Sequence, residues 1–272
     1  MAWVYSNRQN HQYRFKPAIA KVSRRTIDLH QDYASDPIAW ARDVLKFEPD
    51  PKQQEVLGAQ TKRGILNCTR QWGKSTTCAI KAVHYAHFHP ESLVLVASPS
   101  LRQSNEFLRK AKKSVRKLGF RVRGDGENEC SILLPNESRI VGLPESEDTI
   151  RGFSGVGLMI VDEASRVSDE MYNALRPMLA VGGGSLWLMS TPNGKTGFFY
   201  REWSSDRPWM RVQVAAEECP RIPADFLEEE RATLGEEVFR QEYCCDFVMG
   251  EGYLFDEAEI RARISKRVKP LW

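Results

Sequence analysis

The segment from Cys68 to Ser75, CTRQWGKS, joins a short apolar run to a stretch with helical periodicity. A loop between a strand and a helix presents several backbone N–H groups, together with the helix N-terminus, to a single anion. Lys74 would reach the β- and γ-phosphates of a nucleotide there, and the Ser75 hydroxyl would bind Mg²⁺. The standard phosphate loop has glycine where this chain has Cys68, so the prediction depends on the position of GKS between strand and helix.

A pair of acids ends another apolar run, residues 158–161, which continues directly into Asp162 and Glu163. A carboxylate at the carboxyl end of a buried parallel strand faces the crevice where ligands bind. We expect Asp162 to hold the Mg²⁺ through water and Glu163 to orient and deprotonate an attacking water. Acids at strand ends are common, so the pair points to chemistry because the phosphate loop at Lys74 is in the same chain.

A third apolar run, residues 185–192, ends in Ser190, Thr191 and Pro192. We expect the two hydroxyls beside the γ-phosphate, where they would report hydrolysis. Taken alone, the same three residues are typical of a turn.

The elements that must position these segments alternate between strand and helix patterns. Apolar runs predict strands at 64–68, 93–98, 156–163 and 185–192, and helical patterns occupy 38–47, 52–60, 76–88 and 101–118. Three shorter runs, at 121–124, 131–135 and 139–144, predict hairpin strands. Strands that alternate with helices indicate an open, mostly parallel sheet with helices on both faces.

The charge of the chain is segregated along its length. Of the 272 residues, 42% are hydrophobic and 28% charged, as expected for a globular chain with a buried core. The formal net charge of +3 combines +6 before Asp28, +8 over residues 102–123 and −7 over residues 217–246, with the balance spread elsewhere. Such blocks are typical of solvated surfaces and also of contacts with a charged partner.

Several other kinds of site and segment are excluded. The longest uncharged stretch, residues 177–194, contains three consecutive glycines and two prolines, so no membrane helix is predicted. The N-terminus lacks the apolar core of a secretory signal. The six cysteines lack metal-ligand spacing and are expected to be reduced thiols. No second ligand cluster completes a metal site at His84, His87 and His89.

Five segments, in the same order along the chain, resemble the ATPase half of the large terminase subunit, the DNA-packaging motor of tailed bacteriophages. They are DPIAWARDVLKFEPDPKQQEVL, TRQWGKS, LMIVDEA, STPNGKTGFFY and FRQEYCCDFV, which lie within residues 36–256. The resemblance implies an α/β fold of the P-loop NTPase class (ASCE, RecA-like), with a small, mostly helical lid subdomain. The implied parts are a basic N-terminal arm (1–35), an ATPase core (36–200), a lid (201–256) and a C-terminal tail (257–272).

The resemblance also assigns roles to residues of this chain. In the family a glutamine after a proline recognises adenine, which matches Gln53 best, with Gln54 as the alternative. Arg70 matches an arginine that precedes GKS. DTIRG, at 148–152, resembles the segment that supplies a trans-acting arginine finger, so Arg151 is the candidate and Arg139 the competitor.

Together with the motif positions, these matches define three sets of site residues. The catalytic set is Lys74, Arg70, Glu163 and Arg151. The nucleotide-binding set is Gln53, Thr69, Arg70, Gln71, Trp72, Gly73, Lys74, Ser75, Thr76, Ser190 and Thr191. The metal-binding set is Ser75 and Asp162.

The implied function is a Mg²⁺-dependent ATPase that moves double-stranded DNA into a procapsid. The implied cofactors are ATP and Mg²⁺. The implied partners are double-stranded DNA, further copies in a ring (a pentamer on the motor), the portal protein and the small terminase subunit, but no membrane. The expected location is the cytoplasm of the infected bacterium, transiently at the procapsid portal, and no nuclease domain is expected in this chain.

Two other functions stay open from the residues. A DEAD-like helicase would show a similar loop, acidic strand end and hydroxyl motif, but needs a second RecA-like domain of about 150 residues, and the acidic, helical C-terminal segment does not match one. A nucleotide-responsive module without turnover would use the basic blocks to hold nucleic acid or another partner.

Overall fold

The computed structural model describes residues 33–145 and 152–248. In this part of the chain seven strands form one sheet, in the order β3-β4-β2-β5-β6-β1-β7. Neighbouring strands pair in parallel, except that β3 and β4 are antiparallel. The strands are β1 (Arg63–Cys68), β2 (Leu93–Ser98), β3 (Ser131–Leu133), β4 (Arg139–Pro144), β5 (Val156–Asp162), β6 (Ser185–Ser190) and β7 (Met210–Val214).

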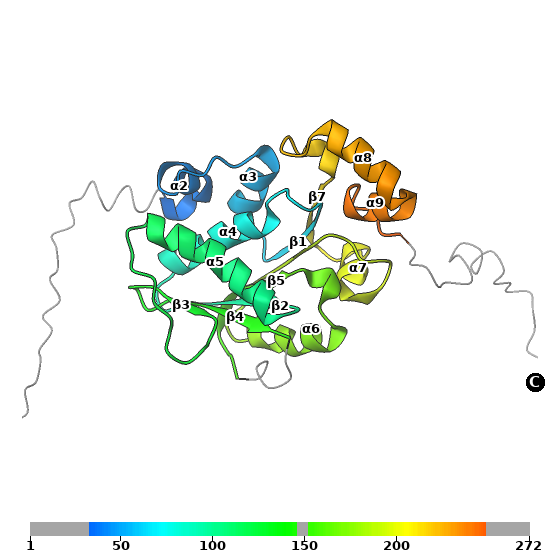
Figure 1. The fold of residues 1–272 in the computed structure, drawn as a ribbon. Coiled ribbons are helices and arrows are strands. Elements are labelled where there is room, and N and C mark those ends of the chain that lie inside the picture. Colours follow the sequence, from blue (N-terminus) through cyan, green and yellow to red (C-terminus); the bar gives the residue numbers. More distant parts are fainter. Residues whose placement is uncertain (1–32, 146–151, 249–272) are drawn as a thin grey trace, which may run out of the picture.

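The helices flank this sheet (Figure 1). They are α2 (Pro37–Asp43), α3 (Pro51–Gly58), α4 (Lys74–Phe88), α5 (Leu101–Lys117), α6 (Asp169–Leu175), α7 (Gly197–Trp203), α8 (Ala224–Leu234) and α9 (Glu236–Glu242). Short 3₁₀ turns occupy Ala164–Arg166, Arg176–Leu179 and Ala216–Glu218. The expected α/β fold of the RecA-like P-loop class is confirmed.

Alternate residues of the central strands face two separate cores. Val94 and Val96 of β2 pack with α4 and α5, whereas Leu93 and Leu95 pack with α6 and α7. Every residue of β2 is buried, because helices cover both faces of the strand. The continuous apolar run at 93–98 therefore predicts this strand correctly, with both of its ends.

Local capping explains where the first helices begin. Asp36 accepts hydrogen bonds from the backbone N–H groups of Ile38 and Ala39 and so caps α2. At α3, Asp50 and Gln53 form a capping box, in which each side chain bonds to the backbone of the other. Both helices end a few residues earlier than the sequence pattern predicts.

The expected strand at 121–124 is wrong, since only an isolated bridge forms there, between Arg123 and Leu133. The segment expected to be a mostly helical lid contains β7, which pairs in parallel with β1 from Gly64 to Cys68. Helices α8 and α9 follow this strand and lie beside its end (Figure 1). The domain boundaries at residues 35, 200 and 256 stay predictions.

No described helix combines the length and the apolar character needed to cross a membrane. All six cysteines are free thiols, and five of them are buried. His84 hydrogen-bonds to the Tyr33 carbonyl, and within residues 33–145 and 152–248 no group of three or more His, Cys, Asp and Glu side chains is placed to bind a metal.

Candidate nucleotide-binding site

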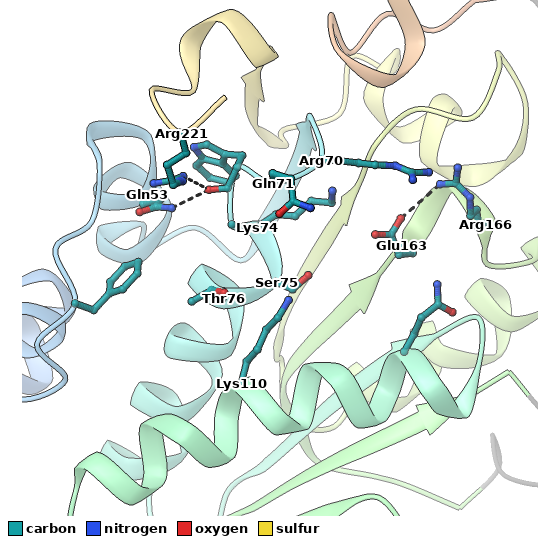
Figure 2. A pocket seen from close by; sticks show the side chains of 14 residues that line it. Gln53, Arg70, Gln71, Lys74, Ser75, Thr76, Lys110, Glu163, Arg166 and Arg221 are labelled. Atoms are coloured by element: carbon teal, nitrogen blue, oxygen red, sulfur yellow. Dashed lines mark hydrogen bonds and ion pairs between the residues drawn. The ribbon is translucent and has the colours of Figure 1, made fainter. Parts of the chain in front are cut away.

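A cavity of about 690 Å³ opens at the carboxyl ends of β1 and β5 (Figure 2). Its walls come from the loop between β1 and α4, from α3 and α5, from the turn after β5 and from the segment before α8. The residues that line it are Phe47, Gln53, Arg70, Gln71, Trp72, Gly73, Lys74, Ser75, Thr76, Gln103, Lys110, Glu163, Arg166 and Arg221.

The loop from β1 to α4 curls around the N-terminus of that helix. Gln71 and Gly73 both have left-handed backbone conformations, with φ angles of 66° and 102°. Gly73 occupies the N-cap position of α4 without a side chain to cap it, which leaves N–H groups of the first turn for a ligand. A Cβ at Gly73 would lie 3.1 Å from Gln53 Nε2, so the close approach of α3 also favours glycine. Lys74 is buried, at 6% exposure. This geometry suits a phosphate chain.

Gln53 links α3 to the phosphate loop. Its Nε2 donates a hydrogen bond to the Trp72 carbonyl at 3.1 Å, and its Oε1 accepts one from Asp50 N at 3.1 Å. The neighbouring Gln54 instead donates to the Pro49 carbonyl and does not line the cavity. Of the two glutamines proposed for adenine, Gln53 is the one placed at the cavity wall.

The acidic pair sits at the end of β5 beside the cavity. Asp162 is 5% exposed and accepts a hydrogen bond from Glu163 N at 3.0 Å. Burial raises the pKa of Asp162 to about 6, with the Glu163 carboxylate acting in the same direction and Lys74 opposing it. Glu163 has a left-handed φ of 50° and turns its side chain to the cavity, whereas Asp162 lies behind the lining.

The donor set fits Mg²⁺. Ser75 lines the cavity and Asp162 lies just below it, so one hydroxyl and one carboxylate face the same region. Mg²⁺ in nucleotide sites takes one or two protein oxygens and completes its shell with phosphates and water. The lack of a larger ligand cluster among the described residues agrees with such an ion.

Ser190 and Thr191 are buried below the cavity and do not line it. They connect to the acidic pair through Ser165, whose Oγ lies 2.7 Å from Ser190 Oγ and donates to the Thr191 carbonyl at 2.8 Å. The buried Thr191 Oγ1 has no hydrogen-bond partner in the structure. Thr69 also lies outside the lining, and its hydroxyl donates to the Glu242 carbonyl at 3.0 Å.

The two arginines considered for a trans-acting finger differ in what is known of them. Arg139, at the start of β4, forms ion pairs with Asp125 at 3.8 Å and Glu127 at 3.4 Å, and does not line the cavity. Arg151 lies outside the described residues.

Five lining residues were not predicted from the sequence: Phe47, Gln103, Lys110, Arg166 and Arg221. Arg221 comes from the segment before α8, hydrogen-bonds to the Trp72 carbonyl and lies 3.6 Å from Asp50. Lys110 is part of the basic block of residues 102–123, and Arg166 stands three residues after Glu163. For these two, closeness to a recognised motif or block was a usable signal.

The sheet and the loop together define a P-loop nucleotide-binding protein of the RecA-like class. Residues 65–262 match the family model described as terminase large subunit, T4likevirus-type, N-terminal. The match covers well over half of the chain, which therefore belongs to this family of phage terminase large subunits.

A curated relative is the terminase large subunit of Escherichia phage T5, 28% identical over 177 residues. The aligned part is 61% of this chain and 40% of that protein, so the chain spans less than half the length of this relative.

Solved structures share the fold. The large terminase ATPase domain of Thermus phage P74-26 has a TM-score of 0.70 at 21% identity, over 78% of this chain and 99% of that one. The HK97 bacteriophage large terminase has a TM-score of 0.64 at 18% identity, over 78% of this chain and 55% of its own. A large terminase from a thermophilic bacteriophage, solved in complex with ADP, has a TM-score of 0.60 at 16% identity, over 73% and 53%.

Proposed function

We propose that this chain is the ATPase part of a DNA-packaging motor, which hydrolyses ATP with Mg²⁺ to move double-stranded DNA into a procapsid. The observation that carries the proposal is a single cavity that combines the phosphate loop around Lys74 with Glu163 and Gln53. Membership of the terminase large-subunit family supports the packaging role. The ADP complex of a structure with the same fold supports an adenine nucleotide as the ligand.

The residues divide the work by position. The N-terminus of α4 and Lys74 hold the phosphates, and Gln53 lies where it can read the base after releasing the Trp72 carbonyl. Ser75 and Asp162 would hold a Mg²⁺ ion, which supplies positive charge to the phosphate oxygens. Glu163 orients and deprotonates the attacking water.

Motion after hydrolysis has a connected route out of the site. Ser165 follows Glu163 closely in the chain and contacts both Ser190 and Thr191. A shift of the turn after β5 is therefore passed to the end of β6. We propose that this contact lets the two hydroxyl residues report hydrolysis without contacting the nucleotide directly.

DNA contact is assigned to phosphate-binding bases on exposed surfaces. Helix α5 has exposed basic side chains at Arg102, Arg109, Lys113, Arg116 and Lys117. Contacts of this kind are independent of sequence, so DNA affinity should fall steeply as salt is raised. Further copies in a ring, the portal protein, the small terminase subunit and a site of action at the procapsid portal in the host cytoplasm belong to the same proposal.

The deciding experiment separates nucleotide binding from turnover. Glu163→Gln keeps the size of the side chain but removes the base, so ATP binding should persist while hydrolysis falls at least about a hundredfold. Binding is followed with a fluorescent ATP analogue and hydrolysis by phosphate release, with Glu170→Gln on α6 as an acid-to-amide control. Wild-type protein that binds ATP but never hydrolyses it, with or without DNA, would contradict the proposal in favour of a binding module.

A further inference from the structure

The last turn of α9 places one carboxylate, that of Glu242, between two arginines of the cavity. Glu242 Oε2 lies 2.7 Å from Arg70 Nε, and its Oε1 accepts a hydrogen bond from Arg70 Nη2 at 3.4 Å. Its Oε1 also lies 3.7 Å from Arg166 Nη2. Arg166 Nη1 in turn lies 3.5 Å from Glu163 Oε2 (Figure 2). Charges of alternating sign therefore run from the phosphate loop to the proposed catalytic glutamate.

Glu242 is the sheltered member of this row. Its side chain is 16% exposed, whereas that of Arg70 is 61% exposed. A long, exposed arginine loses rotamer freedom when it is held in one place, and a carboxylate that meets the flat guanidinium through both oxygens is an effective way to hold it. The position of the Arg70 guanidinium is thus set by Glu242 rather than by packing.

The backbone under Glu242 is itself fixed to the ends of the strands that frame the site. The Thr69 hydroxyl, just after β1, donates to the Glu242 carbonyl at 3.0 Å. The Gly194 N–H, after β6, donates to Gln241 Oε1 at 2.9 Å. Because both neighbours belong to the phosphate loop and to the segment after Thr191, the carboxylate has a defined place relative to the nucleotide cavity.

We propose that Glu242 is a positioning residue, which holds Arg70 and, through Arg166, Glu163 in the arrangement needed for hydrolysis. The inference rests on the proposed ATPase function, because its effect falls on the hydrolysis step and not on nucleotide binding. The competing explanation is an ion pair that only fastens α9 to the core. That explanation predicts a loss of stability with no specific change in kcat.

The test compares Glu242→Gln with Glu237→Gln, an exposed glutamate of the same helix outside the cavity. Misplacing Arg70 by an ångström or so should lower kcat of Glu242→Gln by about tenfold to a hundredfold. Affinity for the fluorescent ATP analogue should change by less than about twofold, since the phosphate cradle of α4 is untouched. Glu237→Gln should match the wild type in both.

A double-mutant cycle makes the assignment specific. If Glu242 acts through Arg70, then Glu242→Gln should lower kcat little further in an Arg70→Ala background. Multiplied losses in the double variant would overturn the proposal, as would a wild-type kcat in a folded Glu242→Gln. Should that variant not fold, Glu242→Asp keeps the charge but draws it back from Arg70, and a wild-type kcat there would equally overturn it. A wild type without hydrolysis would contradict the ATPase function instead.

Discussion

Gln53 Nε2 donates a hydrogen bond to the backbone carbonyl of Trp72, which joins helix α3 to the phosphate loop. The buried amide is fully engaged, because its oxygen accepts from Asp50 N at the start of the same helix. The same carbonyl also accepts a hydrogen bond from Arg221, so one backbone atom of the loop gathers two side chains from separate segments. The base end of the site is therefore organised before a nucleotide arrives.

Gln53→Glu should weaken ATP and ADP binding by about tenfold or more. A carboxylate removes the donor to the Trp72 carbonyl and sets two oxygens against each other in a buried place. The matched control is Gln54→Glu, on the next residue, whose side chain bonds only to Pro49 in its own turn. Titration of both variants with a fluorescent nucleotide decides between them, and equal losses at the two positions would contradict the assignment to Gln53.

Lys110→Gln should weaken ATP binding by about tenfold at low salt, since this lysine of α5 points into the cavity (Figure 2). Lys113→Gln removes the same charge from an exposed position one turn away on the same helix and should leave nucleotide affinity unchanged. The measurement is nucleotide titration at two salt concentrations. Equal effects of the two variants would mean that Lys110 acts only through the overall charge of α5.

Arg151→Ala should leave ATP affinity intact and suppress hydrolysis by about a thousandfold, if it supplies the trans-acting guanidinium. Arg139→Ala should lower stability slightly and leave kcat unchanged, because its guanidinium is paired with Asp125 and Glu127 on its own subunit. Hydrolysis measured against protein concentration checks the assignment. Mixing Arg151→Ala with Glu163→Gln should restore part of the activity, and full activity of Arg151→Ala alone would rule the residue out.

Acidification should destabilise the fold through His84. Its Nε2 lies 2.9 Å from the Tyr33 carbonyl, and burial lowers the pKa of the ring to about 4. The unfolded chain takes up a proton near pH 6.5 while the folded one does not, so this contribution is complete above pH 6.5 and is lost as the pH falls toward 4. Between pH 7.5 and 5 the loss should be about 2 kcal/mol.

Urea unfolding across that pH range measures the effect. His84→Gln should reduce the pH dependence of the unfolding free energy, even where it lowers stability at neutral pH. His89→Gln, at an exposed position of the same helical region, should keep the wild-type slope. An unchanged slope in His84→Gln would show that other groups cause the acid sensitivity.

Gly64→Ala should cost about 2 kcal/mol of stability or more. A Cβ there would stand 2.3 Å from Cε3 of the fully buried Trp187, its partner across β1 and β6. At Gly58, the last residue of α3, a Cβ would meet only the end of the Ile38 side chain at 3.3 Å. Gly58→Ala should therefore be neutral or stabilising by up to about 1 kcal/mol, and thermal unfolding of the two variants gives opposite signs if the contacts are as described.

The central strands could be predicted because burial on both faces leaves an uninterrupted apolar signal. The run at 93–98 is β2, and the ends of β5 and β6 place Asp162 and Ser190 where the motifs require. Strand β7 gave no such signal. Its sequence MRVQV alternates polar and apolar residues at the edge of the sheet, inside a segment whose composition favours a helical lid.

The cavity was predictable where its residues are contiguous and not where the fold gathers them. The loop from Arg70 to Thr76 forms one wall because neighbours in sequence are neighbours in space. Phe47 and Arg221 reach the same cavity only through tertiary packing, and no local pattern marks either of them. The pairing of Glu242 with Arg70 joins residues 172 apart in the chain. Contacts of this kind follow from the sheet order, which composition does not determine.

The parallel pairing of β7 with β1 has a mechanical consequence. The two strands are in register from Gly64 to Cys68, and the chain leaves β7 for α8 in the direction in which β1 leaves for the phosphate loop. A pull along the strands on the helices that follow β7 loads these ladder bonds in shear, all at once, instead of peeling them apart singly. The attachment of α8 and α9 to the nucleotide site is therefore stiff along this one axis and compliant across it.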